Sequence, residues 1–210
     1  IPEYTTDPKL YARKLSAMTL CYTPDTDKNW TVRADNGEPD EKEALTVADY
    51  TDMSGHYAEK AAAELKRYGI GFSAAELQPG KAITEKEFGN LIVNVFKWHG
   101  AVVIDDPDCT DYQSAERSGI FGKGKKAGDG SITRIEAAQY IIRALGIEEY
   151  AKLPGTFVSK FSDVSEEYAG VAAILSGMKV ISGNEAGLFN PDGVLSRADA
   201  LVIVYNYLSR

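Results

Sequence analysis

The sequence predicts an all-α fold in which three helix-loop-helix repeats close around a shared core in a pseudo-threefold arrangement, with a helical extension before them. The first observation is a pattern written three times: a turn, an aliphatic residue, a hydroxyl residue and a carboxylate three positions later. The second is that each copy continues into apolar residues at helical spacing. The third is that one unit of two helices cannot bury both apolar faces, whereas three units that share a core can. The copies span residues 77–88, 126–137 and 189–200.

The first 49 residues precede the repeats and are expected to form a helix followed by a long polar loop. Asp7-Pro8 is a favourable helix start. Between residues 23 and 43 the chain is polar and contains prolines and a glycine, which indicates a surface loop. The ends of a repeat array need covering, so the helix is expected to cap the bundle; a remnant of an earlier repeat or a linker from an upstream domain would have the same pattern. Its apolar face consists of Leu10, Tyr11, Leu15, Met18 and Tyr22.

Each repeated helix is expected to begin with a capping box. A serine or threonine side chain at the N-cap accepts from the backbone N–H three residues later, and an acidic side chain at that position reaches back to the N-cap N–H. The third box is the weakest, because aspartate is shorter than glutamate. The pairs are Thr84 with Glu87, Thr133 with Glu136, and Ser196 with Asp199.

A second repeated motif lies upstream of the first and third copies. An aromatic residue is followed two positions later by aspartate and then by a Tyr-Ala pair, after which an alanine-containing helical stretch runs toward a glycine. One repeat is therefore expected to be a helix, a glycine-bearing loop and a capped helix. The middle copy is degraded at this motif and keeps only Tyr112, Ala115 and Gly119-Ile120. The motif residues are Tyr50, Asp52, Tyr57 and Ala58 in the first copy and Phe161, Asp163, Tyr168 and Ala169 in the third.

At these residues the chain resembles the S-layer homology domain, a family marked by an aromatic-x-Asp opening, a glycine-containing turn and an Ile-Thr-Arg-Ala-Glu-like helix start. The third copy, 161–208, matches throughout, with Tyr168 in place of tryptophan, Ser196 in place of threonine and Asp199 in place of glutamate. The first copy, 50–98, carries Glu85 where the family has arginine, and the second, about 106–147, has a weak opening but a good helix start. The resemblance divides the chain into an extension at 1–49 and repeats at 50–105, 106–160 and 161–210.

The resemblance implies a non-covalent anchor that is secreted, lies at the cell surface and forms part of a larger surface protein. In that family, grooves between adjacent repeats hold a secondary cell-wall polysaccharide, often one with ketal-linked pyruvate. A guanidinium group binds a pyruvyl carboxylate well through charge-assisted hydrogen bonds. The residues carried over by position are Arg134 and Arg197 as anion-binding groups, Tyr57 and Tyr168 as aromatic groove walls, Asp52 and Asp163 as acceptors, and Gly183 as a point of close approach.

Local charge adds one more candidate. Lys126 belongs to a basic loop before the second capped helix, whose N-terminus would offer N–H groups to an anion; a solvated loop is the alternative. The aspartates and tyrosines named above have structural alternatives too, because aspartate caps helices and tyrosine packs. Glu85 would repel a pyruvyl group, so the groove built around the first copy is expected to be weak or silent.

Composition narrows the other possible functions. The chain carries 31 acidic against 23 basic side chains, a net charge of −8, which argues against nucleic-acid binding. No apolar run is long enough to span a bilayer, so no membrane insertion is expected. Cys21 and Cys109 fit neither a disulfide framework nor a metal site, and the sequence leaves open whether they pair.

No cofactor, metal or catalytic activity is expected. Residues 119–126 nearly match a phosphate-binding loop, but Lys126 stands where a magnesium-binding hydroxyl belongs. Residues 105–117 suggest a calcium loop, but Arg117 stands where the bidentate glutamate belongs. The histidines lie in no catalytic motif. A protein-interaction module on the same scaffold and a glycan-processing enzyme are the alternatives to an anchor.

Overall fold

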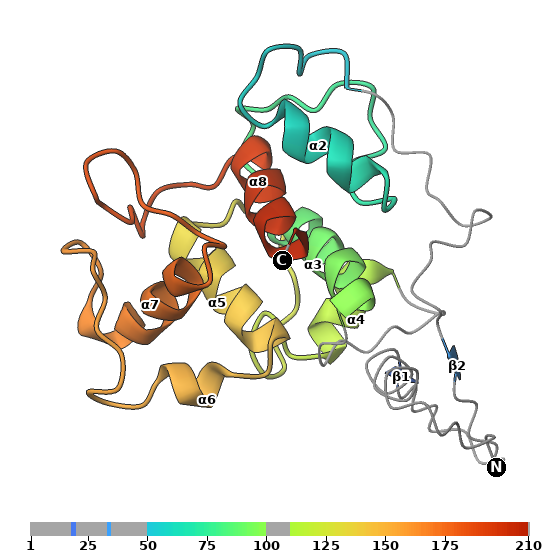
Figure 1. Ribbon diagram of the computed structural model, residues 1–210. Coiled ribbons are helices and arrows are strands. Elements are labelled where there is room, and N and C mark those ends of the chain that lie inside the picture. Colours follow the sequence, from blue (N-terminus) through green and yellow to red (C-terminus); the bar gives the residue numbers. More distant parts are fainter. Residues whose placement is uncertain (1–17, 20–32, 35–49, 100–109, 210) are drawn as a thin grey trace, which may run out of the picture.

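The computed structural model describes residues 18–19, 33–34, 50–99 and 110–209 (Figure 1). This part of the chain is helix-rich, which confirms the all-α prediction. Most of the expected N-terminal helix and polar loop lies outside the described residues, as do Cys21 and Cys109. The helix prediction is wrong at Met18, because its backbone pairs with Ala34 in a short antiparallel ladder instead of forming a helical turn. The two strands are β1 (Met18–Thr19) and β2 (Arg33–Ala34).

Long and short helices alternate along the described repeats. The long helices are α3 (Glu85–His99), α5 (Arg134–Ala144) and α8 (Arg197–Leu208). The shorter helices that precede them are α2 (Glu59–Lys66), α4 (Asp111–Arg117) and α7 (Ala169–Gly177). Helix α6 (Glu148–Ala151) and the 3-10 helix η1 (Glu166–Tyr168) lie between α5 and α7.

Each short helix packs against a long helix from a different predicted repeat. Helix α2 contacts α8, α4 contacts α3, and α7 contacts α5 (Figure 1). The long helix α3 also contacts both α5 and α8. The apolar faces are therefore buried between repeats, as a shared core requires.

The long helices begin as their capping residues predict. Thr84 N–H donates to Glu87 Oε2 (3.0 Å) and Glu87 N–H donates to Thr84 Oγ1 (3.2 Å), which completes the box at α3. The box at α5 is complete as well. At α8, Ser196 Oγ accepts from Asp199 N–H (3.1 Å). The Asp199 carboxylate, however, accepts from the Ser196 hydroxyl and not from the Ser196 backbone N–H. The third box is thus the incomplete one, because the shorter aspartate does not span the distance.

The residues just before the three long helices hydrogen-bond to one another in a closed ring. Ile83 N–H donates to Leu195 O (3.0 Å), Leu195 N–H donates to Ile132 O (2.9 Å), and Ile132 N–H donates to Ile83 O (3.2 Å). All three side chains are buried. The ring therefore joins segments far apart in the sequence through backbone groups that would be costly to bury without partners.

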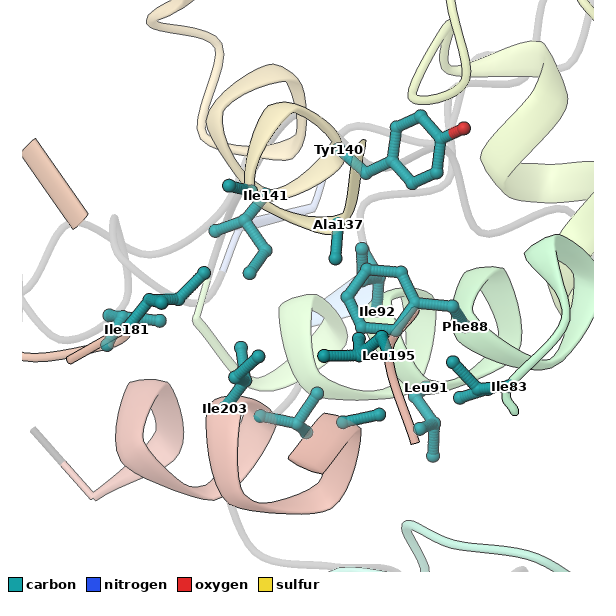
Figure 2. Packing of buried hydrophobic residues seen from close by; sticks show 14 of the residues in the cluster. Ile83, Phe88, Leu91, Ile92, Ala137, Tyr140, Ile141, Ile181, Leu195 and Ile203 are labelled. Carbon is teal, nitrogen blue, oxygen red and sulfur yellow. The ribbon is translucent and has the colours of Figure 1, made fainter. Parts of the chain in front are cut away.

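The hydrophobic core surrounds this ring. Figure 2 shows Phe88, Leu91 and Ile92 of α3 packed beside residues of α5 and α8. Phe88 is 0% exposed, and burial of a side chain of this size contributes about 2–3 kcal/mol. From the other segments, Figure 2 labels Ile83, Ala137, Tyr140, Ile141, Ile181, Leu195 and Ile203.

We predict that Leu195→Ala lowers the free energy of unfolding by about 2–5 kcal/mol, because it leaves a cavity where the ring meets the core. Leu195 is 1% exposed, whereas its neighbour Val194 is 60% exposed. Val194→Ala is the matched control and should change the stability by less than about 0.5 kcal/mol. Urea unfolding followed by circular dichroism measures both. Equal effects of the two substitutions would contradict the assignment of Leu195 to the core.

Candidate functional site

The first residues of the three long helices are Glu85, Arg134 and Arg197. Each backbone N–H bonds to the loop before another long helix: Arg197 N–H to Lys81 O, Arg134 N–H to Gly193 O, and Glu85 N–H to Gly130 O. Each of these side chains therefore lies at a junction between two predicted repeats. We call the junctions the Glu85, Arg134 and Arg197 interfaces.

The Arg197 interface is neutralised within the protein. Arg197 is 8% exposed, and its guanidinium donates to Leu77 O (3.0 Å) and to Glu87 Oε1 (2.5 Å). It also lies over the Phe72 ring, 4.8 Å from the centroid. Burial opposes ionisation of Glu87, but hydrogen bonds from Arg197 and from Thr84 N–H lower its pKa below the ordinary value. The guanidinium thus already has a carboxylate partner.

The Arg134 interface has the same type of charge without that partner. Arg134 is half-buried, donates from Nη2 to Ser182 O (2.5 Å), and lies 5.5 Å from the Phe189 ring centroid. Its buried Nε has no hydrogen-bond acceptor, and the same is true of the Nε of Arg197. Among the described residues, no carboxylate forms an ion pair with Arg134. This guanidinium can therefore accept an anionic ligand.

Tyr57 and Asp199 lie close enough to Arg134 to act on its charge. Burial lowers the pKa of Arg134, while the charges of Asp199 and Tyr57 act in the opposite direction. Tyr57 donates its hydroxyl to Asp199 Oδ1 (2.6 Å), and its side chain remains largely exposed. Burial and the Asp199 carboxylate raise the pKa of Tyr57 to about 12. An exposed aromatic ring therefore lies near an arginine that has no ion pair among the described residues.

The Glu85 interface has the opposite polarity. The Glu85 carboxylate accepts from Lys125 Nζ (2.7 Å), Gly128 N–H (2.7 Å) and Tyr140 OH (2.5 Å). Burial opposes its ionisation, but these three bonds together lower its pKa from the ordinary value. Burial and Glu85 raise the pKa of Tyr140. The position of Glu85 in the repeat was evident from sequence, but its pairing with Lys125 was not, because the two lie forty residues apart.

Asp52 and Asp163 hold turns in place. Each carboxylate accepts two consecutive backbone N–H groups in the loop that leads to a long helix. Burial opposes the ionisation of both groups, but these bonds together lower the pKa of each below its ordinary value. This geometry accounts for both aspartates structurally, which was the alternative to a role in ligand binding. The donors are Leu77 and Gln78 for Asp52 (2.9 and 2.7 Å) and Phe189 and Asn190 for Asp163 (2.9 and 2.7 Å).

The remaining candidates lie in different surroundings. A Cβ at Gly183 would lie 2.5 Å from the Phe161 ring and 2.9 Å from Leu188 O, so internal packing requires this glycine. Lys126 is exposed in the loop before α5. Tyr168 ends η1 and lines a pocket of about 140 Å³ between α5, α6 and α7. The structure thus gathers Arg134 and Tyr57 at one interface, with Tyr168 in a separate pocket.

The expectation of free N–H groups at the start of α5 is wrong. Arg134 N–H donates to Gly193 O (2.9 Å), Ile135 N–H donates to Pro191 O (3.0 Å), and Glu136 N–H donates to Thr133 Oγ1. Sequence reasoning missed the first two of these bonds because their acceptors come from a loop about sixty residues away. An anion at this interface would be held by side chains and not by the helix N-terminus.

Part of the chain matches a known protein family. Residues 160–201 match the S-layer homology domain. The matched S-layer homology segment contains η1, α7 and the start of α8, and with them Asp163, Tyr168, Gly183 and Arg197. Glu85 and Arg134 lie outside it.

Relatives of the chain include surface proteins and enzymes. It is 31% identical over 90 residues to the middle cell wall protein of Brevibacillus brevis and 32% identical over 90 residues to the surface layer protein of Brevibacillus choshinensis; each match covers 42% of this chain and 8% of the relative. The exoglucanase XynX of Acetivibrio thermocellus is 26% identical over 154 residues, 67% of this chain and 14% of that protein.

This chain therefore spans only a small part of the length of each relative. The S-layer homology match and the two surface proteins support a cell-wall anchoring module at the cell surface.

Two negative findings apply to the described residues alone. Within 50–99 and 110–209, no helix is long and apolar enough to cross a membrane. The same residues contain no group of three or more histidine, cysteine or acidic side chains placed to hold a metal ion.

We predict that Glu85→Gln destabilises the protein by about 2 kcal/mol at pH 7, because it removes charge-assisted hydrogen bonds at a nearly buried carboxylate. The folded-state pKa of Glu85 is lowered, so its contribution is present at neutral pH and disappears as the pH falls through that pKa. The stabilities of wild type and variant should therefore converge in acid, below the ordinary glutamate pKa of about 4.3. Denaturant unfolding across this pH range measures the difference. The exposed Glu185→Gln is the control; a pH-independent gap for Glu85→Gln would contradict the ion pair.

Proposed function

We propose that this chain is a non-covalent anchor that binds a secondary cell-wall polysaccharide through a pyruvylated sugar and tethers a longer surface protein. The S-layer homology match supports the anchoring role. Relatives named as a cell wall protein and a surface layer protein are many times longer than the matched region, as expected when an anchor forms one part of a larger protein.

The architecture in this proposal is three repeats around a pseudo-threefold axis, at 50–105, 106–160 and 161–210. The closed ring of backbone hydrogen bonds supports it, because each of its three segments stands in the same place before a long helix. The pairing of each short helix with a long helix from another repeat supports it as well. The proposal expects one groove at each junction between repeats.

The carboxylate of a pyruvyl ketal is the ligand group that Arg134 suits. The observation that carries this proposal is a half-buried guanidinium that forms no ion pair with any described residue. Partial burial strengthens its attraction for an anion, since fewer waters compete. Charge-assisted hydrogen bonds to a carboxylate are shorter and stronger than neutral ones. The exposed Tyr57 ring offers an apolar face for a sugar beside it.

The Glu85 interface is proposed to take no pyruvyl group. A carboxylate that already receives three hydrogen bonds fills the place where an anion would otherwise bind. A second anion there would meet a like charge. This agrees with the expectation from sequence that the first copy is weak or silent.

We predict that Arg134→Ala weakens binding of purified pyruvylated cell-wall polysaccharide at least tenfold, because it removes about 1.5–3 kcal/mol of charge-assisted hydrogen bonding. Titration calorimetry before and after mild acid removal of the ketal pyruvate measures this effect. Arg67→Ala is the matched control, since Arg67 is an exposed arginine that pairs with Glu64. Pyruvate-dependent binding lost only in Arg134→Ala would support the anchor.

A protein-interaction module is the second candidate function. Tyr150, Leu153 and Val158 are 65%, 49% and 84% exposed along α6 and the loop after it, which gives the chain an apolar surface away from Arg134. Binding through that surface would survive loss of Arg134 and Arg197. Failure of the folded protein to bind several pyruvylated glycans would favour this function over the anchor.

A further inference from the structure

We infer that the length of the capping carboxylate decides which interface accepts an external carboxylate: Asp199 leaves Arg134 open, whereas Glu87 closes the Arg197 interface. The inference rests on the proposed function and deepens it. It assigns one open carboxylate site to the chain and names the residue that keeps the site open.

The three interfaces share one geometric relation. The first residue of each long helix bonds through its backbone N–H to the loop before another long helix, which leads into the capping box of that helix. Arg197 of α8 bonds through its N–H to Lys81 O, in the loop before α3, and its guanidinium meets Glu87, the capping carboxylate of α3. Arg134 of α5 bonds through its N–H to Gly193 O, in the loop before α8. Its counterpart is therefore Asp199, the capping carboxylate of α8.

Asp199 is one methylene shorter than Glu87, and its oxygens are engaged elsewhere. Oδ1 accepts from Tyr57 OH (2.6 Å), and Oδ2 accepts from Ser196 Oγ (2.7 Å). The Asp199 charge acts on Arg134, yet it makes no ion pair with it. Two hydrogen bonds and a short side chain thus hold the carboxylate back from the guanidinium. At the Arg197 interface the longer glutamate caps its own helix with one oxygen and reaches the arginine with the other.

The third interface follows from the same relation. Glu85 of α3 bonds through its N–H to Gly130 O, in the loop before α5, and its counterpart is Glu136, the capping carboxylate of α5. Two carboxylates would repel each other, and Lys125 supplies the compensating charge to Glu85. Glu136 makes both hydrogen bonds of its own capping box, one through its backbone N–H and one through its carboxylate. Among the described residues, two interfaces are therefore balanced internally, and Arg134 is left without an ion pair.

The test exchanges the two side-chain lengths. The probe is a methyl hexopyranoside with a 4,6-linked pyruvyl ketal, and its methyl ester is the uncharged control. Wild type is expected to bind one probe per chain. Asp199→Glu is expected to weaken binding at least tenfold, because the longer carboxylate reaches Arg134. Glu87→Asp is expected to raise the stoichiometry to two, because Arg197 loses its partner.

Asp199→Asn separates side-chain length from direct contact with the ligand. This variant is short and uncharged, so it should bind the probe at least as well as wild type. Loss of binding in Asp199→Asn, unchanged binding in Asp199→Glu, or a stoichiometry that stays at one in Glu87→Asp would each overturn the inference. Pyruvate-independent binding, or no binding by folded wild type, would instead overturn the proposed function.

A measurement without any glycan tests the geometry on its own. Asp199→Glu should raise the melting temperature or leave it unchanged, because glutamate completes the capping box at α8 and pairs with Arg134. In a double-mutant cycle with Arg134→Gln, the stabilising effect of Asp199→Glu should shrink when the arginine is absent. Additive effects of the two substitutions would show that the longer carboxylate does not reach Arg134, which would overturn the inference even where the probe does not bind.

Discussion

The closed ring of hydrogen bonds among Ile83, Ile132 and Leu195 is the constraint on which the rest of the described structure depends. A helix N-terminus leaves its first N–H groups without partners inside the helix. Here the ring brings each long helix to a loop whose carbonyl groups accept these N–H groups. Because the three acceptor loops come from different parts of the chain, the core and the capping of the long helices are formed together. Loss of one segment would expose backbone groups at two junctions.

The same constraint determines which charges meet. The first residue of each long helix lies at a junction with the loop before another long helix. An arginine facing a glutamate gives an internal ion pair, as at Arg197, and a glutamate in that position needs a lysine, as at Glu85. An arginine facing a shorter aspartate has no ion pair. Residues that cap helices therefore also control access to the junctions, and stability and ligand binding are linked through the same side chains.

Much of this follows from the sequence, and the reasons for the rest are physical. The three capped helices, the weaker third box and the unusual role of Glu85 could be predicted because they depend on residues that lie close together in the sequence. The partners of Arg197, Arg134 and Glu85 lie forty or more residues away, so no local pattern reveals that Glu87 neutralises one arginine or that Lys125 balances the glutamate. The roles of the repeated aspartates and of Gly183 also depend on contacts between distant loops. One further feature was visible in the sequence, because the third capping carboxylate is aspartate where the other two are glutamate. The effect of Asp199 on the Arg134 interface could be inferred only from the geometry of the junction.

The most direct test of this account is a crystal structure of the chain with a pyruvylated cell-wall disaccharide. The account predicts the ketal carboxylate within hydrogen-bonding distance of the Arg134 guanidinium, with a sugar ring near Tyr57 and the ion pairs of Arg197 and Glu85 intact. A carboxylate bound at Arg197 with Glu87 displaced, or a glycan bound only in the pocket beside Tyr168, would contradict it.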